Sequence, residues 1–165
     1  MMARSIIWTI LFSVVAAILQ STVIGRFAIF SVVPDLALCI VVFSAYVNGT
    51  MTGQISGFFS GLLLDFLSAA PLGLNSFVRT IIGAVAGVFK GAFFLDVIFM
   101  PAILCILATI FKAIIVFIVH FIIPNVPTYS LIESKFWIEL GLNAVCAPLL
   151  FFLLRKFKPI LIGRG

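Results

Sequence analysis

Long apolar runs separated by short turns form the main pattern of this chain, and six of the runs predict membrane-spanning helices. A helix crosses the apolar core of a bilayer with about 20 residues, and with fewer where it packs against neighbouring helices. The six runs are 6–24, 33–47, 51–67, 74–89, 101–123 and 136–154. The pattern therefore predicts an all-α integral membrane protein with six transmembrane helices in one domain, residues 1–165.

Two parts of this division have an alternative. The second and third runs are separated only by Asn48, Gly49 and Thr50, which are typical of turns, and a single helix over 33–67 would be too long for a bilayer. A tight hairpin is therefore expected. The first run resembles a signal peptide, but it lacks a convincing cleavage motif and is interpreted as the first helix.

The basic residues predict the orientation in the membrane. Six helices place both termini on one side, and the side richer in Lys and Arg is cytoplasmic. Arg26 and Lys135 are expected on the outer side. The residues expected beside the termini are Arg4, Lys90, Arg155, Lys156, Lys158 and Arg164. We therefore expect cytoplasmic termini, with segment 91–100 lying along the cytoplasmic surface.

The composition excludes several functional classes. Hydrophobic residues make up 64% of the chain and charged residues only 9%, which leaves too little polar surface for a soluble domain. The net charge of +5 is not arranged as a stripe with exposed aromatics, so no nucleic-acid partner is expected. Cys39, Cys105 and Cys146 lie in apolar runs without metal-ligand spacing. With no set of nucleophile and base either, we expect no enzyme, metal or cofactor.

Glycine recurs at every fourth position in two consecutive helices, and each row includes one charged residue. The two rows are Gly53, Gly57, Gly61 and Asp65, and then Arg79, Gly83, Gly87 and Gly91. Small residues on one helix face let two backbones pack closely inside a membrane. In an antiparallel hairpin Asp65 and Arg79 would meet at the outer end, and we expect an ion pair because an isolated charge there is costly. Such a pair would serve either helix packing or partner binding.

Other polar residues also recur toward the outer ends of the helices. Asp35 follows a proline at the start of the second helix, where it would cap free backbone N–H groups or join Arg79. Lys112 and His120 share one face of the fifth helix, and Glu139 and Asn143 one face of the sixth. We expect these four to form a second polar seam, with structural pairing favoured over a proton relay.

Two segments carry a family resemblance. "VVPDLALCIVVF" and "GQISGFFSGLLLDFLSAAPLGLNSF" resemble the signature of the rod shape-determining protein MreD family. The matching positions are Pro34, Asp35, Gly57, Gly61, Asp65, Pro71, Leu72 and Gly73. The Pro71, Leu72 and Gly73 turn is stiffened by its proline and has little bulk, which suits the approach of another chain.

The resemblance implies a non-enzymatic scaffold of the bacterial elongation machinery in the inner membrane. Its implied partners are MreC, RodA, a penicillin-binding transpeptidase, indirectly MreB, and membrane lipid. The family is also similar to the S components of energy-coupling-factor vitamin transporters, which implies a related helical fold. The alternative function is therefore binding of a small molecule, with Asp35, Asp65, Asn75 and Arg79 as candidate lining.

Overall fold

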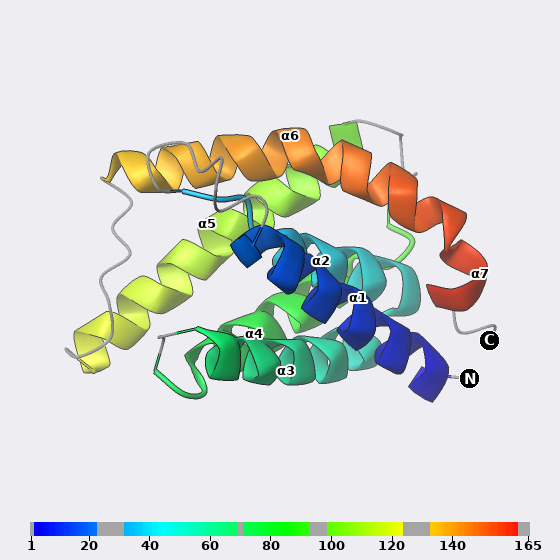
Figure 1. The fold of residues 1–165 in the computed structure, drawn as a ribbon, viewed down its shortest axis with the longest axis horizontal. Helices are drawn as coiled ribbons and strands as arrows, with labels where there is room; N and C mark the ends of the chain where they lie inside the picture. Colours follow the sequence, from blue (N-terminus) through cyan, green and yellow to red (C-terminus); the bar gives the residue numbers. More distant parts are fainter. Residues whose placement is uncertain (1, 23–31, 69–70, 93–98, 124–132, 162–165) are drawn as a thin grey trace.

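The computed structural model is a helical bundle (Figure 1) and describes residues 2–22, 32–68, 71–92, 99–123 and 133–161. Its helices are α1 (Met2–Thr22), α2 (Leu36–Asn48), α3 (Thr50–Leu67), α4 (Leu74–Val88), α5 (Phe99–Ile122), α6 (Ser134–Lys156) and the short α7 (Lys158–Leu161). Each of the six predicted runs forms one of the helices α1 to α6. Arg26, Arg164 and residues 93–98 of the predicted surface segment lie outside the described residues.

The helices differ in their capacity to cross a membrane. Three described helices are long and apolar enough to do so, namely α1 over Ala3–Thr22, α5 and α6. The apolar helices α2 and α4 have 13 and 15 residues, and thus lengths of about 20 and 23 Å. The helix α3 has 18 residues but includes three glycines and an aspartate. All six helices are thus confirmed as helices, whereas six membrane crossings stay a prediction.

The short helix α2 lies at the centre of the bundle. It packs against α1, α3, α4, α5 and α6, and all its residues from Ala37 to Tyr46 are buried. Phe43 meets Phe151 of α6 edge to face, with ring centroids 5.0 Å apart. Side chains that are mostly apolar on every face of α2 suit a helix that other helices surround, which fits its central position.

The chain reverses between successive helices, so that α1 begins and α6 ends at the same end of the bundle (right in Figure 1). Short polar contacts join the segments there. Ser5 and Asn48 donate side-chain hydrogen bonds of 2.7 and 2.9 Å to the carbonyl of Leu161 in α7. Consequently the end of α1 and the starts of α2, α4 and α6 lie at the opposite end, where the candidate site is found.

The helices α3 and α4 form the most extensive contact between any two helices of the described chain. Their glycines account for the close approach, because a Cβ added to Gly61 would lie 2.5 Å from the carbonyl oxygen of Asn75 and from the Cα of Ser76. Added Cβ atoms at the other positions would also collide with the backbone of the facing helix. These positions are Gly53, Gly57, Gly83 and Gly87.

The predicted packing role of Gly91 is wrong. The helix α4 ends at Val88, and Gly91 lies in the following turn with a φ of 70°, where an added Cβ would meet no atom of the other described residues within 4 Å. The four-residue glycine spacing thus continues past the end of α4, whereas the close contact with α3 stops at Gly87. Gly91 instead occupies the left-handed conformation that glycine adopts most readily.

The glycine contact predicts a stability difference between two identical substitutions. Gly83→Ala would place its Cβ 2.6 Å from the carbonyl carbon of Gly53, and we expect a loss of about 2 kcal/mol, or a melting temperature lower by roughly 5 °C. Gly141→Ala in α6 is the control, because no atom of another described segment lies within 4 Å of its added Cβ. Thermal unfolding of both variants in detergent measures the difference, and equal melting temperatures would contradict the close approach of α3 and α4.

Candidate functional site

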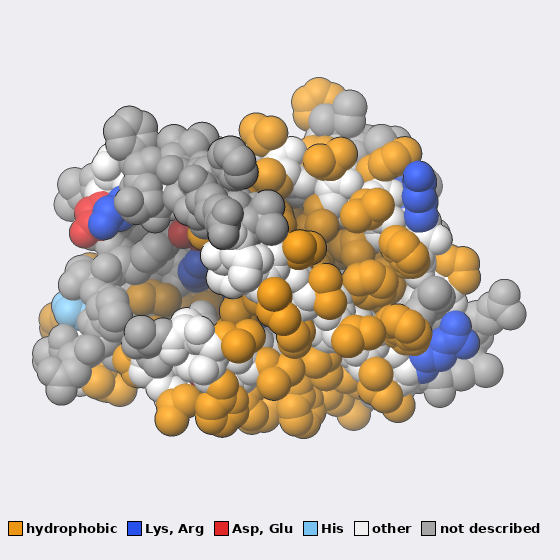
Figure 2. All heavy atoms as spheres, in the orientation of Figure 1, with side chains coloured by type: hydrophobic (Ala, Val, Ile, Leu, Met, Phe, Trp, Pro, Cys, Tyr) orange, Lys and Arg blue, Asp and Glu red, His pale blue; other side chains and the backbone are white. Residues whose placement is uncertain are grey.

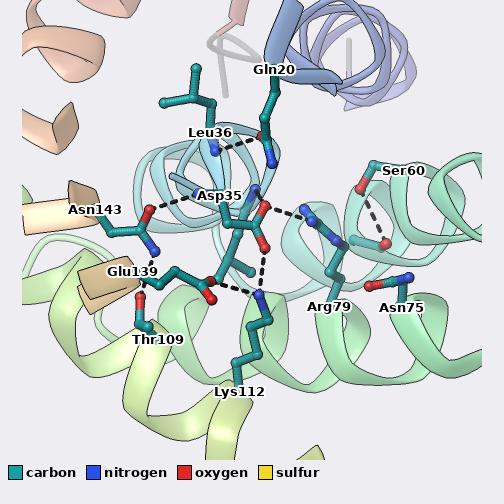
Figure 3. Close-up of polar contacts among 12 residues, drawn as sticks. Gln20, Asp35, Leu36, Ser60, Asn75, Arg79, Thr109, Lys112, Glu139 and Asn143 are labelled. Atoms are coloured by element: carbon teal, nitrogen blue, oxygen red, sulfur yellow. Dashed lines mark hydrogen bonds and ion pairs between the residues drawn. The ribbon is translucent and has the colours of Figure 1, made fainter. Parts of the chain in front are cut away.

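Charged and polar side chains from four helical segments meet in one cluster (Figure 3). Asp35 precedes α2, Arg79 belongs to α4, Lys112 to α5, and Glu139 and Asn143 to α6. The side chains of Arg79, Asp35 and Glu139 are only 5, 9 and 9% exposed. We name these five residues the polar cluster.

Asp35 is the centre of the polar cluster. Its Oδ1 accepts hydrogen bonds from Arg79 Nη2 at 2.7 Å and from the backbone N–H of Leu38 at 3.1 Å. Its Oδ2 accepts one from Lys112 Nζ at 3.0 Å. The two roles weighed for Asp35, the cap of α2 and the partner of Arg79, are thus present together. One carboxylate satisfies a helix start and two cations that would be costly to bury alone.

The second predicted seam joins the first group through Lys112. The ammonium of Lys112 also donates to Glu139 at 2.7 Å, and Asn143 accepts from the backbone N–H of Asp35 at 2.7 Å. Asn143 in turn donates to Thr109 at 2.9 Å. The two acids and two bases make the cluster neutral overall. His120 lies in the last turn of α5 and takes no part in the hydrogen bonds described for this cluster.

The predicted ion pair between Asp65 and Arg79 is wrong. The carboxylate of Asp65 instead accepts hydrogen bonds from the backbone N–H groups of Gly73, Asn75 and Ser76, at 3.0, 3.0 and 3.1 Å. It accepts a fourth, of 2.9 Å, from the Asn75 side chain. The first turn of a helix has unpaired N–H donors that attract a carboxylate, so Asp65 at the end of α3 binds the start of α4.

The carboxylate of Asp65 also shapes the turn of Pro71, Leu72 and Gly73, which we name the outer turn. Gly73 has a left-handed backbone with a φ of 93°, and the N–H of Leu74 donates to the carbonyl of Pro71 at 3.2 Å. The side chain of Leu72 is 72% exposed. Asp65 therefore binds the inner side of the turn, while Pro71 and Leu72 face outward.

Two members of the site were missed by sequence reasoning. Gln20 accepts a hydrogen bond of 3.2 Å from the N–H of Leu36, and Thr109 binds Asn143. Thr109 lies three residues before Lys112, on the same helix face, and this spacing was the available signal. Gln20 had no such signal, since only the folded bundle brings the end of α1 beside the start of α2.

A pocket of about 350 Å³ lies beside the polar cluster. Figure 2 shows charged side chains at the floor of a hollow on this side of the molecule. Asp35, Asn75 and Arg79, predicted as lining for a small molecule, do line it, whereas Asp65 is not among the lining residues. The lining residues in the described part of the chain are Gln20, Val32, Val33, Asp35, Leu64, Ser68, Asn75, Arg79, Lys112, Lys135 and Glu139.

The other reactive residue types form no such group in the described part of the chain. Cys39 and Cys105 are buried free thiols and Cys146 is a partly buried one. No three His, Cys, Asp or Glu side chains within the described residues lie in a group that would hold a metal ion.

The sequence model of the family described as rod shape-determining protein MreD matches residues 2–158. This chain belongs to the MreD family. The match covers nearly the whole chain and includes both the polar cluster and the α3–α4 pair. With its long apolar helices, the chain is therefore a rod shape-determining membrane protein. No curated protein and no solved structure matches it.

The geometry predicts which charged residues are energetically coupled. Asp35→Asn and Arg79→Gln should each destabilise the fold, and the double variant should deviate from additivity by about 1 kcal/mol or more because the two groups are bonded. Asp65→Asn with Arg79→Gln should be additive within about 0.5 kcal/mol, since they share no described bond.

Unfolding of the five variants in mixed detergent micelles measures both coupling energies against wild type. A larger coupling for Asp65 with Arg79 than for Asp35 with Arg79 would contradict the assignment.

Proposed function

We propose that this MreD-family protein is a non-enzymatic scaffold of the cell-elongation machinery in the bacterial inner membrane. In this role it binds MreC and, with MreC, holds the glycosyltransferase RodA and a penicillin-binding transpeptidase together. Its link to the cytoskeletal protein MreB is indirect. The observation that carries the proposal is the family match over residues 2–158.

The surface of the bundle supports a scaffold role. Large apolar side chains face outward on the long helices, among them Phe99 and Phe121 of α5, 75 and 85% exposed, and Val145 and Leu149 of α6, 76 and 73% exposed. In a bilayer such surfaces contact lipid or the helices of partner proteins. The connections from α2 to α3 and from α3 to α4 are short, a single residue and six residues, and partner binding within the membrane matches this helical surface best.

The distribution of charge supports cytoplasmic termini. The end of the bundle where α1 begins and α6 ends holds Arg4, Arg155 and Lys156, and Lys90 joins it through a 3.0 Å hydrogen bond to the carbonyl of Asn48. Lys135 lies at the other end, beside the pocket. The basic end of a multi-pass protein faces the cytoplasm. The pocket and the outer turn would then face the periplasm.

A second candidate function is favoured by the pocket. A polar cavity with three of the residues expected to line a ligand site is a feature that a substrate-binding S component of a vitamin transporter would also need. The two functions differ in their partners. A scaffold is retained with wall-synthesis proteins, and an S component with a pair of ATPases and their membrane subunit.

Affinity purification from native membranes separates the two functions. The tagged protein, expressed at its native level and extracted in mild detergent, should retain MreC and the wall-synthesis enzymes above the level seen with an unrelated tagged membrane protein. Mass spectrometry identifies the retained proteins. Recovery of an ATPase pair with its membrane subunit, and no MreC, would overturn the scaffold proposal.

Cell shape provides an independent prediction. Depletion of the protein in its own host should convert rods to rounded cells, and Gly141→Ala should restore the rods. Gly83→Ala should restore them only to the extent that its folded level survives, because it disrupts the α3–α4 contact. Microscopy together with quantification of the membrane-extracted protein measures both. Normal rods after complete depletion would contradict a role in shape.

A further inference from the structure

We propose that the pocket beside the polar cluster binds the phosphate group of an anionic lipid, with an acyl chain in the adjoining apolar groove. This ligand goes beyond the scaffold role and does not depend on which proteins the scaffold holds. The observations that carry it are the charge of the pocket, its unsatisfied hydrogen-bond donor and the groove that continues from it.

The pocket has an excess of positive charge. Asp35 and Glu139 are its acidic lining residues, and both bind Lys112. Arg79 pairs with Asp35, whereas Lys135 lines the pocket and has no carboxylate partner among the described residues. Among the described lining residues three cations therefore face two acids, a net charge of +1, which favours an anion over a cation as the occupant.

A buried hydrogen-bond donor without a partner points the same way. Arg79 Nη1 has no hydrogen-bond partner among the described residues, and its side chain is only 5% exposed. Gln20 accepts from the N–H of Leu36, which fixes its carbonyl oxygen toward α2 and leaves its NH₂ group as a donor beside the pocket. A buried guanidinium nitrogen without an acceptor is costly, and a bound oxyanion would supply the acceptor.

A groove lined mainly by apolar side chains continues from the pocket along α1 and α3. This groove of about 260 Å³ shares Gln20, Val33, Leu64 and Ser68 with the pocket. The rest of its lining is Ala17, Ile18, Ser21 and Leu67. A polar cavity that opens into an apolar groove matches a molecule with a charged head and a hydrocarbon chain, whereas a free anion would use only the first part.

The depth of the site fits a lipid headgroup. Gln20 lies two residues before the end of α1, which is long enough to cross a bilayer, so the pocket lies near the level of the headgroups. The central helix α2 begins only at Leu36 and is about 20 Å long, shorter than the apolar core of a bilayer. Its late start leaves the space that the pocket occupies.

The test uses the full-length protein in detergent, with dioleoyl phosphatidic acid as the probe and inorganic phosphate as the free anion. Native mass spectrometry should show one phosphatidic acid bound per chain, and its affinity should fall about fivefold in Lys135→Gln. Lys156→Gln is the matched control, because Lys156 is an exposed lysine at the opposite end of the bundle. The affinity of this variant for phosphatidic acid should change less than twofold.

A groove variant separates the lipid from a free anion. Leu67→Gln alters an exposed groove residue and should weaken phosphatidic acid binding without affecting inorganic phosphate. Equal thermal stabilisation by inorganic phosphate and by phosphatidic acid, with no effect of Leu67→Gln, would overturn the lipid assignment. Equal losses in Lys135→Gln and Lys156→Gln, or no bound lipid in any variant, would overturn the site itself.

Discussion

The buried carboxylate of Asp35 accepts hydrogen bonds from cations on two different helices, and the arrangement of α2, α4, α5 and α6 depends on this interaction. Its bonds to Arg79 and Lys112, of 2.7 and 3.0 Å, fix the rotation of α4 and α5 toward the start of α2. Removing one partner from a buried pair leaves an uncompensated charge and costs several kcal/mol. The two ion pairs therefore matter more for selecting which helix faces meet than for the total stability of the fold. Lipid tails and apolar side chains are similarly apolar, so they select little between one face of a helix and another.

The central helix and the pocket are two results of the same geometry. Because α2 is short and surrounded by other helices, the cluster at its N-terminus lies level with Gln20, two residues before the end of the longer α1. The polar pocket occupies this depth, and its charges are compensated mainly by one another. A rigid polar interior with an apolar outer surface suits a protein whose described helices offer their outer faces to lipid and partners.

The hairpin of α3 and α4 is built by a separate mechanism. Glycines bring the backbones together along its length, and Asp65 joins its outer end by binding the first turn of α4. Because Asp65 binds the N–H groups there, Arg79 is available to pair with Asp35, and this ion pair joins the hairpin to the start of α2. Asp65 also binds the inner side of the outer turn, and Leu72 is exposed at its tip.

The sequence by itself determined the class of protein, the six main helices and the five members of the polar cluster as candidates, because apolar length and four-residue spacing are local properties. The motif at Asp35, Asp65 and Gly73 was also sufficient for the family. Only the tertiary structure decided the partners of the charges. Asp65 and Arg79 are close along the chain and opposite in charge. The carboxylate of Asp65 nevertheless binds the N–H groups at the start of α4 and not the guanidinium of Arg79. Spacing within one helix gives no information on which other helix faces it. The tertiary structure was therefore needed to show that Lys112 joins Asp35 to Glu139, and that a pocket lies beside them.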